Sequence, residues 1–353
     1  MLQFGRIIAI AVIAAGLVSE SACAGRDFSP MPRAPLPPAA VSPGAPVPAP
    51  PRPDFATWLA AFEQRALAAG ISARTIDRAF AGVTYVPRVI ELDQRQPEVK
   101  LGFGDYISRV VSEERIEAGQ AHMIEDTWLL TSVSRRYGVQ PAYITALWGM
   151  ETEYGSLIGN FSTISALATL AYDGRRAPLF SAQLIDALKI IDRFGLPPEQ
   201  LRGSWAGAMG QTQFMPLSFL RFAVSYSGTG APDIWTNKGD VLASIANYLS
   251  KSGWDPRDGW GLEVTLPLGF DTGLIGNISG GAEKPGADWQ ALGIRALDGS
   301  DLPEFHGVLS LVQPGGPGGP TLLVTGNYRV LLNWNRSLYF ATAVSFLADR
   351  IDN

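Results

Sequence analysis

Two glutamates, Glu151 and Glu153, stand near the end of the apolar segment ALWGMETEYGS, residues 146–156. A proline five residues before this segment and a glycine near its end predict a helix over residues 141–154. Successive helical residues turn by about 100°, so Glu151 shares one face with apolar side chains, namely Ile144, Leu147 and Trp148. Glu153 lies on the opposite face, which we expect to be exposed to water. The two carboxyl groups are therefore not expected to form a catalytic pair.

The predicted position of Glu151 affects its acidity. A carboxyl group on a core-facing stripe is desolvated, and the nearby helix C-terminus adds negative potential, so both effects should raise its pKa. A carboxylic acid that stays protonated near neutral pH can act as a general acid. The alternative from the residues alone is a structural glutamate that reaches an arginine or backbone donors.

A second segment, GSWAGAMGQTQFMP at residues 203–216, combines small residues with neutral polar side chains. The polar residues are Ser204, Gln211 and Gln213. Small residues let a ligand approach the backbone closely, and a hydroxyl and two amides can hydrogen-bond acetamido and sugar hydroxyl groups. The segment is a candidate carbohydrate-binding loop, with a structural turn as the alternative.

Composition limits the chemistry available to this chain. The net charge is −5 and the 28 basic residues are spread along the chain, so nucleic acid is not an expected partner. Two histidines and one cysteine leave almost no residues for His/Cys metal sites, Cys–His nucleophiles or disulfides. Any catalysis is therefore expected to depend on carboxyl groups.

The N-terminus predicts export. Residues 1–24 resemble a signal peptide, because the apolar stretch 7–18 is too short to span a bilayer. Cleavage after Ala24 would release the chain into the periplasm, whereas processing at Cys23 would give an outer-membrane lipoprotein. Residues 25–53 form a proline-rich linker, read either as a tether or as a disordered leader with no such role.

From Asp54 onward helical periodicity dominates, so the predicted fold is mainly α. The first helix begins at this Asp cap and stops at Gly70. Further helices are predicted near residues 73–81, 104–118, 120–137, 141–154, 163–171, 179–194, 216–225 and 239–252. Short β-type runs follow at residues 264–268, 307–312, 321–326 and 328–334. We therefore predict a helical catalytic domain (54–259), a small β-rich subdomain (260–334) and a C-terminal helix (335–353) that packs back on the helices.

Several motifs together resemble one family. WGMETEYG, GSWAGAMGQTQFMP, IANYLSKSGW and the closing NWNRSLYFATAVSFLADRI are similar to the membrane-bound lytic murein transglycosylase B family, and the likeness covers most of the chain from Asp54, including VIELDQRQPE. The resemblance implies a lysozyme-like helical fold with one catalytic glutamate, Glu151. In that family the glutamate protonates the glycosidic oxygen between N-acetylmuramic acid and N-acetylglucosamine. It then acts as base while the muramic acid C6 hydroxyl attacks C1, which gives a 1,6-anhydro sugar.

The resemblance also implies substrate-binding residues. Ser204 and Gln213 match positions near the N-acetyl groups of the substrate, and Tyr248 and Asn335 match positions in the cleft. Arg175 and Arg176 match a pair expected to meet the anionic lactyl or peptide part of the substrate. The alternatives are a half-buried core tyrosine for Tyr248 and solvated loop charges for the two arginines.

Two departures from the family pattern bear on the site. Some members carry an acidic calcium-type loop, but the matching residues 225–237 hold Asp233 as their only carboxylate, so we expect no metal ion and no cofactor. Trp334 stands where a tyrosine often precedes the closing asparagine; it keeps a face for sugar stacking but lacks the hydroxyl.

Three functions follow as hypotheses. The first is a periplasmic lytic transglycosylase acting on peptidoglycan strands, with cell-wall synthesis or division proteins and a lipid anchor at Cys23 as further candidate partners. The second is a hydrolytic muramidase on the same fold. The third is a non-catalytic peptidoglycan-binding scaffold, which the presence of Glu151 disfavours.

Overall fold

The computed structural model describes residues 53–95, 101–277 and 281–353. The predicted signal peptide, Cys23 and nearly all of the linker lie outside these residues. The α-helices of the described residues are α1 (Phe55–Ala68), α2 (Ala73–Phe80), α3 (Pro87–Gln94), α4 (Phe103–Val110), α5 (Glu113–Glu125), α6 (Thr127–Tyr137), α7 (Pro141–Thr152), α8 (Thr163–Asp173), α9 (Ala177–Phe194), α10 (Pro216–Phe222), α11 (Lys238–Lys251), α12 (Gly286–Ala291), α13 (Gly326–Trp334) and α14 (Leu338–Asp352). Among the described residues no helix is both long and apolar enough to cross a membrane.

The strands are short and fall into two sheets. β1 (Phe161–Ser162) pairs with β2 (Arg202–Gly203). The larger sheet holds β3 (Gly261–Thr265), β4 (Ile275–Gly276), β5 (Glu283–Lys284), β6 (Arg295–Ala296), β7 (Leu309–Val312) and β8 (Thr321–Val324). Its order is β4-β7-β8-β3-β6, with β5 also paired to β7. The predicted mainly helical fold with a small β-rich part near the C-terminus is confirmed.

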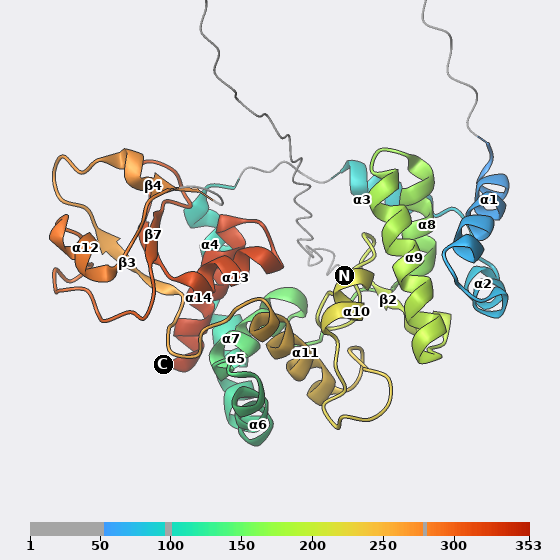
Figure 1. Cartoon of the computed structure of the whole chain (residues 1–353), viewed down its shortest axis with the longest axis horizontal. Coiled ribbons are helices and arrows are strands. Elements are labelled where there is room, and N and C mark those ends of the chain that lie inside the picture. The colour runs from blue at the N-terminus through green and yellow to red at the C-terminus, as the bar shows by residue number, and fades with distance from the viewer. Residues whose placement is uncertain (1–52, 96–100, 278–280) are drawn as a thin grey trace, which may run out of the picture.

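The elements extend across the molecule in three groups (Figure 1). Helices α1, α2, α8 and α9 lie at one end, the larger sheet lies at the other, and α5, α6, α7, α11 and α14 lie between them. Helix α7 packs against α5, α6, α11 and α14 of the middle group. The C-terminal helix α14 thus lies against α7.

Helix α7 is buried on nearly every side. The residues from Ala142 to Gly149 are all buried, and Thr152 is buried as well. This corrects the sequence analysis, which assigned a wet face to the helix. Such a helix is held by packing around its whole circumference rather than along one stripe.

The larger sheet contributes to two hydrophobic cores. Val312, Leu322 and Val324 belong to the main core, which they share with the helices. Leu311 and Leu323 point to the other side and pack in a smaller core around Trp289. Because alternate residues of a strand face opposite sides of a sheet, β7 and β8 join the helical body to the smaller core.

Some element boundaries differ from the prediction. The predicted helix 104–118 breaks at residues 111–112, where the Ser112 side chain accepts a hydrogen bond from the Arg115 amide and starts α5. The predicted helix 120–137 breaks at Asp126, between α5 and α6. Helix α3 was not predicted. The run 328–334 was predicted as a strand and is part of α13, because Thr325 caps a helix there and the apolar residues that follow recur at helical spacing.

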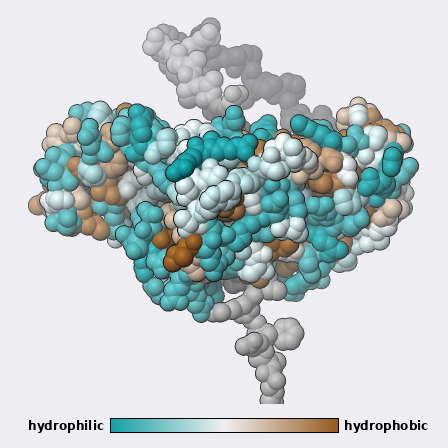
Figure 2. All heavy atoms as spheres, turned by 90° about the horizontal axis from the view of Figure 1, so that it is seen from below, coloured by the Kyte–Doolittle hydropathy of each residue, from teal (hydrophilic) through white to brown (hydrophobic). Residues whose placement is uncertain are grey.

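One face of the surface is largely hydrophilic. Figure 2 shows hydrophobic residues there as separate small groups rather than one continuous area. Among the described residues the most exposed large apolar side chains are Leu268, which follows β3, and Ile124 and Trp128, which lie four residues apart at the junction of α5 and α6. Single exposed apolar residues of this kind are usual on protein surfaces.

Candidate active site

Glu151 lies in the last turn of α7, and an unusual backbone follows it. The helix ends at Thr152, two residues earlier than predicted, because Glu153 and Tyr154 both adopt left-handed conformations, with φ of 49° and 56°. Gly155 is also left-handed, with φ of 87°. Consecutive non-glycine residues with left-handed backbone conformations are uncommon and cost conformational free energy. The chain therefore turns sharply directly after the glutamate.

Tyr154 holds this turn against α7. Its hydroxyl donates to the Arg115 carbonyl oxygen at 2.6 Å, and its ring packs on Trp148. The ring lies directly over Gly149, where a Cβ atom would be 2.5 Å from it. A glycine in the middle of α7 thus makes room for the tyrosine.

Glu153 is separate from Glu151. It lies at the end of α7 rather than on a wet helix face, and its carboxylate pairs with the Arg115 guanidinium. Glu151 instead accepts a hydrogen bond at Oε1 from the Trp334 indole Nε1–H, at 2.7 Å. The two glutamates of the motif therefore have different partners and different environments.

The environment of Glu151 raises its pKa to about 7, from an ordinary value of 4.5. Burial is the main cause, because it disfavours the charged form, and the hydrogen bond from Trp334 acts in the opposite direction. A carboxyl group with this pKa is protonated in a substantial fraction of molecules at neutral pH and can donate or accept a proton there.

Aromatic rings surround the Glu151–Trp334 pair. The Trp334 ring packs on Tyr248 at 4.6 Å and on Phe214 at 5.3 Å between centroids. Tyr106 of α4 lies close enough for the Glu151 charge to contribute to the rise of its pKa to about 12, after the larger effect of burial. These rings contribute to the desolvation of the carboxyl group, although the Glu151 residue as a whole remains partly exposed.

Tyr248, predicted to bind substrate, is brought to this cluster but is 9% exposed. Its hydroxyl donates to the Asn333 carbonyl oxygen at 2.7 Å, and burial raises its pKa to about 12. These contacts favour the half-buried core tyrosine that the sequence analysis left as the alternative. A contact with substrate remains a prediction.

Asn335 follows Trp334 directly and is therefore near the cluster. Its backbone N–H donates to the Leu331 carbonyl oxygen at 3.1 Å at the end of α13. Its side-chain Oδ1 is buried and has no hydrogen-bond partner within the described part of the chain. A buried polar atom without a partner is costly, which fits the predicted role in binding a polar ligand.

The segment 203–213 forms a tight loop joined to the same cluster. Met209 forms isolated antiparallel β-bridges with both Gly203 and Phe214. The Phe214 ring in turn contacts the ring of Trp334. At Gly203 a Cβ atom would collide with the Ala208 carbonyl oxygen. Gly203 therefore allows the close approach of the loop's own backbone, whereas Gly207 and Gly210 make room for Leu167 and Ile234 outside the loop.

Ser204 and Gln213 are partly engaged within this loop. The Ser204 hydroxyl accepts a hydrogen bond from the Ala208 amide at 3.2 Å. The Gln213 side-chain amide donates to the carbonyl oxygens of Ile158 and Gly210, at 3.2 Å and 2.9 Å. Both residues shape the loop, and their predicted contacts with N-acetyl groups remain predictions.

Gln211 has a structural role. Its Oε1 accepts from the Trp148 indole N–H at 2.9 Å, and its Nε2 donates to the Trp235 carbonyl oxygen at 2.9 Å. Gln211 thereby links α7 to the loop that carries Ser204 and Gln213.

Arg175 and Arg176 are engaged elsewhere in the fold. Both guanidinium groups pair with the carboxylate of Asp93, which is buried in α3. Their ion pairs are with Asp93 and Asp173 and not with residues of the cluster around Glu151. The Arg175 side chain is 50% exposed, so the predicted contact with an anionic part of the substrate stays a prediction that rests on this arginine more than on its neighbour.

The loop 225–237 is organised by two carboxylates. Asp233 accepts hydrogen bonds from the amides of Trp235 and Thr236, both at 2.9 Å. Asp240, buried in α11, accepts from the amides of Tyr226 and Asp233, both at 2.8 Å. In the described ranges no three His, Cys, Asp or Glu side chains are grouped closely enough to hold a metal ion.

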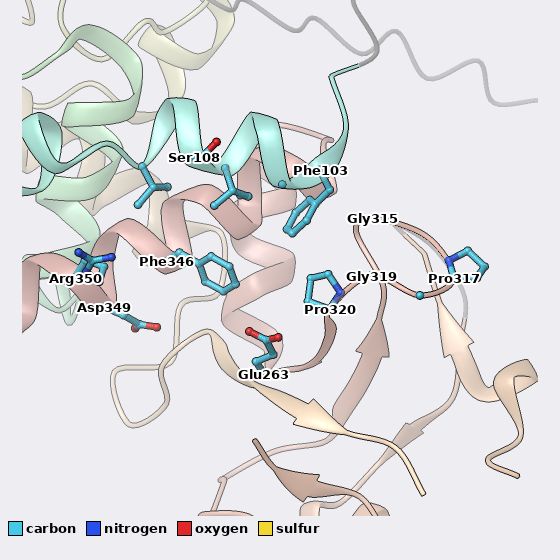
Figure 3. A pocket seen from close by; sticks show the side chains of 14 residues that line it. Phe103, Ser108, Glu263, Gly315, Pro317, Gly319, Pro320, Phe346, Asp349 and Arg350 are labelled. Carbon is cyan, nitrogen blue, oxygen red and sulfur yellow. The ribbon is translucent and has the colours of Figure 1, made fainter. Parts of the chain in front are cut away.

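A separate groove of about 1150 Å³ lies between α4, α14, β3 and the β7–β8 loop (Figure 3). Figure 3 shows the carboxylates of Glu263 and Asp349 directed toward this groove. None of the predicted site residues lines it. The groove therefore does not belong to the candidate active site.

Sequence reasoning missed two contributors to the site. Trp334 was noted as a departure from the family, but its hydrogen bond to Glu151 joins residues 183 positions apart, so no local pattern could reveal it. Tyr106 comes from α4, whose predicted helix carried no motif. Both contacts depend on how α4, α7 and α13 pack.

Comparisons with known proteins show the family of this chain. The family model described as the transglycosylase SLT domain matches residues 54–349. Membrane-bound lytic murein transglycosylase B of Escherichia coli (strain K12) is 34% identical over 173 residues, which are 47% of this chain and 48% of that protein. The matched region thus spans about half the length of this curated relative.

Solved structures extend the similarity to most of the chain. SltB3 from Pseudomonas aeruginosa, in complex with NAG-anhNAM-pentapeptide, is 44% identical with a TM-score of 0.81, over 85% of this chain and 80% of that chain. The lytic transglycosylase Slt35 from Escherichia coli, in complex with calcium, is 25% identical with a TM-score of 0.69, over 83% of this chain and 92% of that chain.

Proposed function

Since the chain belongs to the transglycosylase SLT domain family, we propose that it is a lytic transglycosylase that cleaves peptidoglycan in the cell envelope. The observation that carries this proposal is the protonatable Glu151 in its aromatic surroundings. Its pKa of about 7 suits a group that first gives and then takes a proton. The similarity to SltB3 in complex with an anhydro-muropeptide supports the substrate class.

The reaction can be written with Glu151 alone. Its carboxylic acid gives a proton to the glycosidic oxygen between N-acetylmuramic acid and N-acetylglucosamine, and the bond from C1 to that oxygen breaks. The resulting carboxylate takes the proton of the muramic acid C6 hydroxyl while that oxygen bonds to C1. The product is 1,6-anhydro-N-acetylmuramic acid, and no water is consumed.

The arrangement of carboxyl groups favours this route over hydrolysis. Ordinary retaining and inverting glycosidases use a second carboxyl group at a set separation from the first. The other glutamate of the motif, Glu153, is bound to Arg115, and the partner of Glu151 in the described structure is an indole. Intramolecular attack by the C6 hydroxyl needs no second carboxylate to activate water.

The remaining assignments extend this proposal. Ser204, Gln213 and Asn335 are candidates to bind the sugar N-acetyl and hydroxyl groups, and the muropeptide strand is the expected partner. The name of the Escherichia coli relative, a membrane-bound enzyme, supports a location in the cell envelope.

Digestion of purified peptidoglycan sacculi tests the proposal. The protein and its Glu151→Gln variant are compared, and the released muropeptides are identified by mass spectrometry. We expect anhydro-muramic ends from the protein and a loss of at least about 100-fold in the variant, the usual scale for a general acid–base group. Glu153→Gln is the matched control and should retain activity.

Two outcomes would contradict the proposal. Reducing muramic acid ends would show a hydrolytic muramidase with a water-activating group. No release from the unmodified protein, together with retention on the sacculi, would show a peptidoglycan-binding protein instead.

A further inference from the structure

The hydrogen bond between Trp334 and Glu151 has a chemical consequence that rests on the proposed function. An indole N–H is a donor only, because its nitrogen carries no available lone pair. The Glu151 oxygen that receives it, Oε1, must therefore act as an acceptor. In a protonated carboxyl group the carbonyl oxygen is the better acceptor, so an N–H directed at Oε1 favours placing the proton on Oε2.

We propose that Trp334 is a positioning residue that assigns the two oxygens of Glu151 different tasks. Its N–H occupies Oε1, so the proton that is transferred resides on Oε2. Oε2 gives the proton to the glycosidic oxygen and later takes the proton of the C6 hydroxyl. Oε1 keeps the same hydrogen bond in both half-reactions.

The packing around Trp334 gives the bond a fixed direction. The indole lies at the last residue of α13 and is in contact with the rings of Tyr248 and Phe214. These ring contacts restrict its rotation. The distance of 2.7 Å is at the short end for a nitrogen donor, as expected for a bond that strengthens when the carboxyl group is charged.

Charged groups on neighbouring elements do not offer Glu151 a competing partner in the described structure. Arg115 of α5 is paired with Glu153. Tyr248 of α11 already donates its hydroxyl to the Asn333 carbonyl oxygen, and burial raises the pKa of the Tyr106 phenol of α4 to about 12, so that group carries no charge between pH 4 and 9. Tyr339 of α14 packs its ring on Tyr106. The indole is therefore the group expected to control the carboxyl group.

A tyrosine at this position would behave differently. A phenol hydroxyl can donate or accept, so it could either donate a hydrogen bond to the glutamate or accept one from its protonated oxygen. The tryptophan removes this ambiguity. The departure noted in the sequence, Trp334 in place of a tyrosine, thus exchanges an adaptable partner for one that fixes the position of the proton.

The experiment measures how the pKa of Glu151 depends on the indole N–H. The carbon-13 resonance of the Glu151 carboxyl group is titrated in protein labelled at glutamate, and it is identified by its absence in Glu151→Gln. In parallel, kcat/KM for release of anhydro-muropeptides is measured between pH 4 and 9. The variants are Trp334→Phe, Trp334→Tyr and an isosteric replacement of Trp334 by 3-benzothienylalanine, which keeps both rings and lacks the N–H.

Loss of the donor should raise the pKa of Glu151 by about one unit, because a hydrogen bond to a charged group stabilises the carboxylate by that order. The basic limb of the activity profile should move upward by the same amount, and the maximal rate should fall by about 10-fold or more. Trp334→Tyr restores a hydrogen-bond donor, so in this variant the pKa of Glu151 should return toward its value in the unmodified protein.

Trp254→Phe is the matched control. Its indole N–H donates to the Gln140 side chain at 2.8 Å and its ring packs on Tyr143, away from Glu151. This variant should leave the pKa of Glu151 and the activity profile unchanged. The benzothienyl variant preserves the shape of the side chain, so it reports the loss of the N–H even if Trp334→Phe fails to fold.

The inference is wrong if the pKa of Glu151 is the same with and without the N–H, or if Trp254→Phe shifts it equally. The titration is independent of the product formed. An enzyme that releases reducing ends would overturn the proposed function while leaving the hydrogen-bond result readable, so the two failures are distinguishable.

Discussion

At the scale of residues, Glu151 shows how burial converts an ordinary carboxylic acid into a neutral-pH acid and base. The same burial should be visible in the stability of the protein. A neutral carboxyl group is tolerated inside the aromatic cluster, whereas a carboxylate is retained there at a cost that one hydrogen bond from Trp334 only partly offsets.

The sign of the pH effect follows from the raised pKa. Below pH 4.5 Glu151 is protonated in both the folded and the unfolded chain. Between pH 4.5 and about 7 the unfolded chain loses its proton first, so the free energy of unfolding falls, and above pH 7 the loss is complete. Stability associated with Glu151 is therefore present at low pH and lost as pH rises through the folded pKa.

Glu151→Gln should remove this dependence, since an amide stays neutral. We expect the variant to match the unmodified protein near pH 4 and to exceed it at pH 8 by about 1–3 kcal/mol in free energy of unfolding. Urea unfolding at both pH values measures the difference, and Glu153→Gln, which loses a partly exposed ion pair instead, should show no gain. An equal difference at both pH values would contradict the argument.

At the scale of elements, the end of α7 matters most, because Thr152 at its end and the left-handed turn that follows both contact Gln211 of the 203–213 loop. Gly155 is the position in this turn where space for a side chain is most limited. A Cβ atom there would collide with the side-chain amide of Gln211, which itself binds Trp148 of α7. The turn and the loop are therefore fitted to each other.

Gly155→Ala should disturb both stability and activity. Gly195 at the end of α9 is the matched control, with φ of 67° and nothing near a new Cβ atom. We expect Gly195→Ala to cost about 1 kcal/mol through its backbone alone and to leave peptidoglycan release unchanged. Gly155→Ala should cost about 2–4 kcal/mol and lower that release. Equal effects in urea unfolding and in the sacculus assay would argue against the fitted turn.

How far the sequence predicts this structure also depends on the element. The starts of α1 and α7 were predicted because caps and proline positions are local signals, and the approximate extents of α8, α9 and α11 followed from periodicity. The breaks near Ser112 and Asp126, and the helical state of α13, depend on caps whose strength the apolar pattern does not reveal.

The candidate site was predictable to a similar degree. Glu151 was found from its place among apolar residues and from the family resemblance. Its indole partner, the Asp93 pair of Arg175 and Arg176, and the role of Asp240 in the 225–237 loop were not found, because each contact joins different elements and depends on the packed fold.

At the scale of the whole molecule, the larger sheet ties two hydrophobic cores into one unit. Leu322 belongs to the core shared with the helices, and its neighbour Leu323 belongs to the core around Trp289. Since the two residues lie on opposite faces of the same strand, loss of either core should weaken the other.

We therefore expect one cooperative thermal transition for the described body. Leu322→Ala and Leu323→Ala should each cost about 2–5 kcal/mol and shift the whole transition, as measured by differential scanning calorimetry. Leu268→Ala, at an exposed position, is the control and should change the transition little. A separate low-temperature transition in Leu323→Ala would show that the smaller core unfolds independently.

The burial of α7 on nearly all sides also determines where this scaffold can vary. Side chains on that helix are confined by neighbours, so their replacement mainly affects folding. Glu151 is thus held in a fixed position, its side-chain partner Trp334 comes from the end of α13, and the predicted substrate contacts come from the 203–213 loop. Redesign toward other glycans would accordingly have to change these two segments and leave the helix as it is.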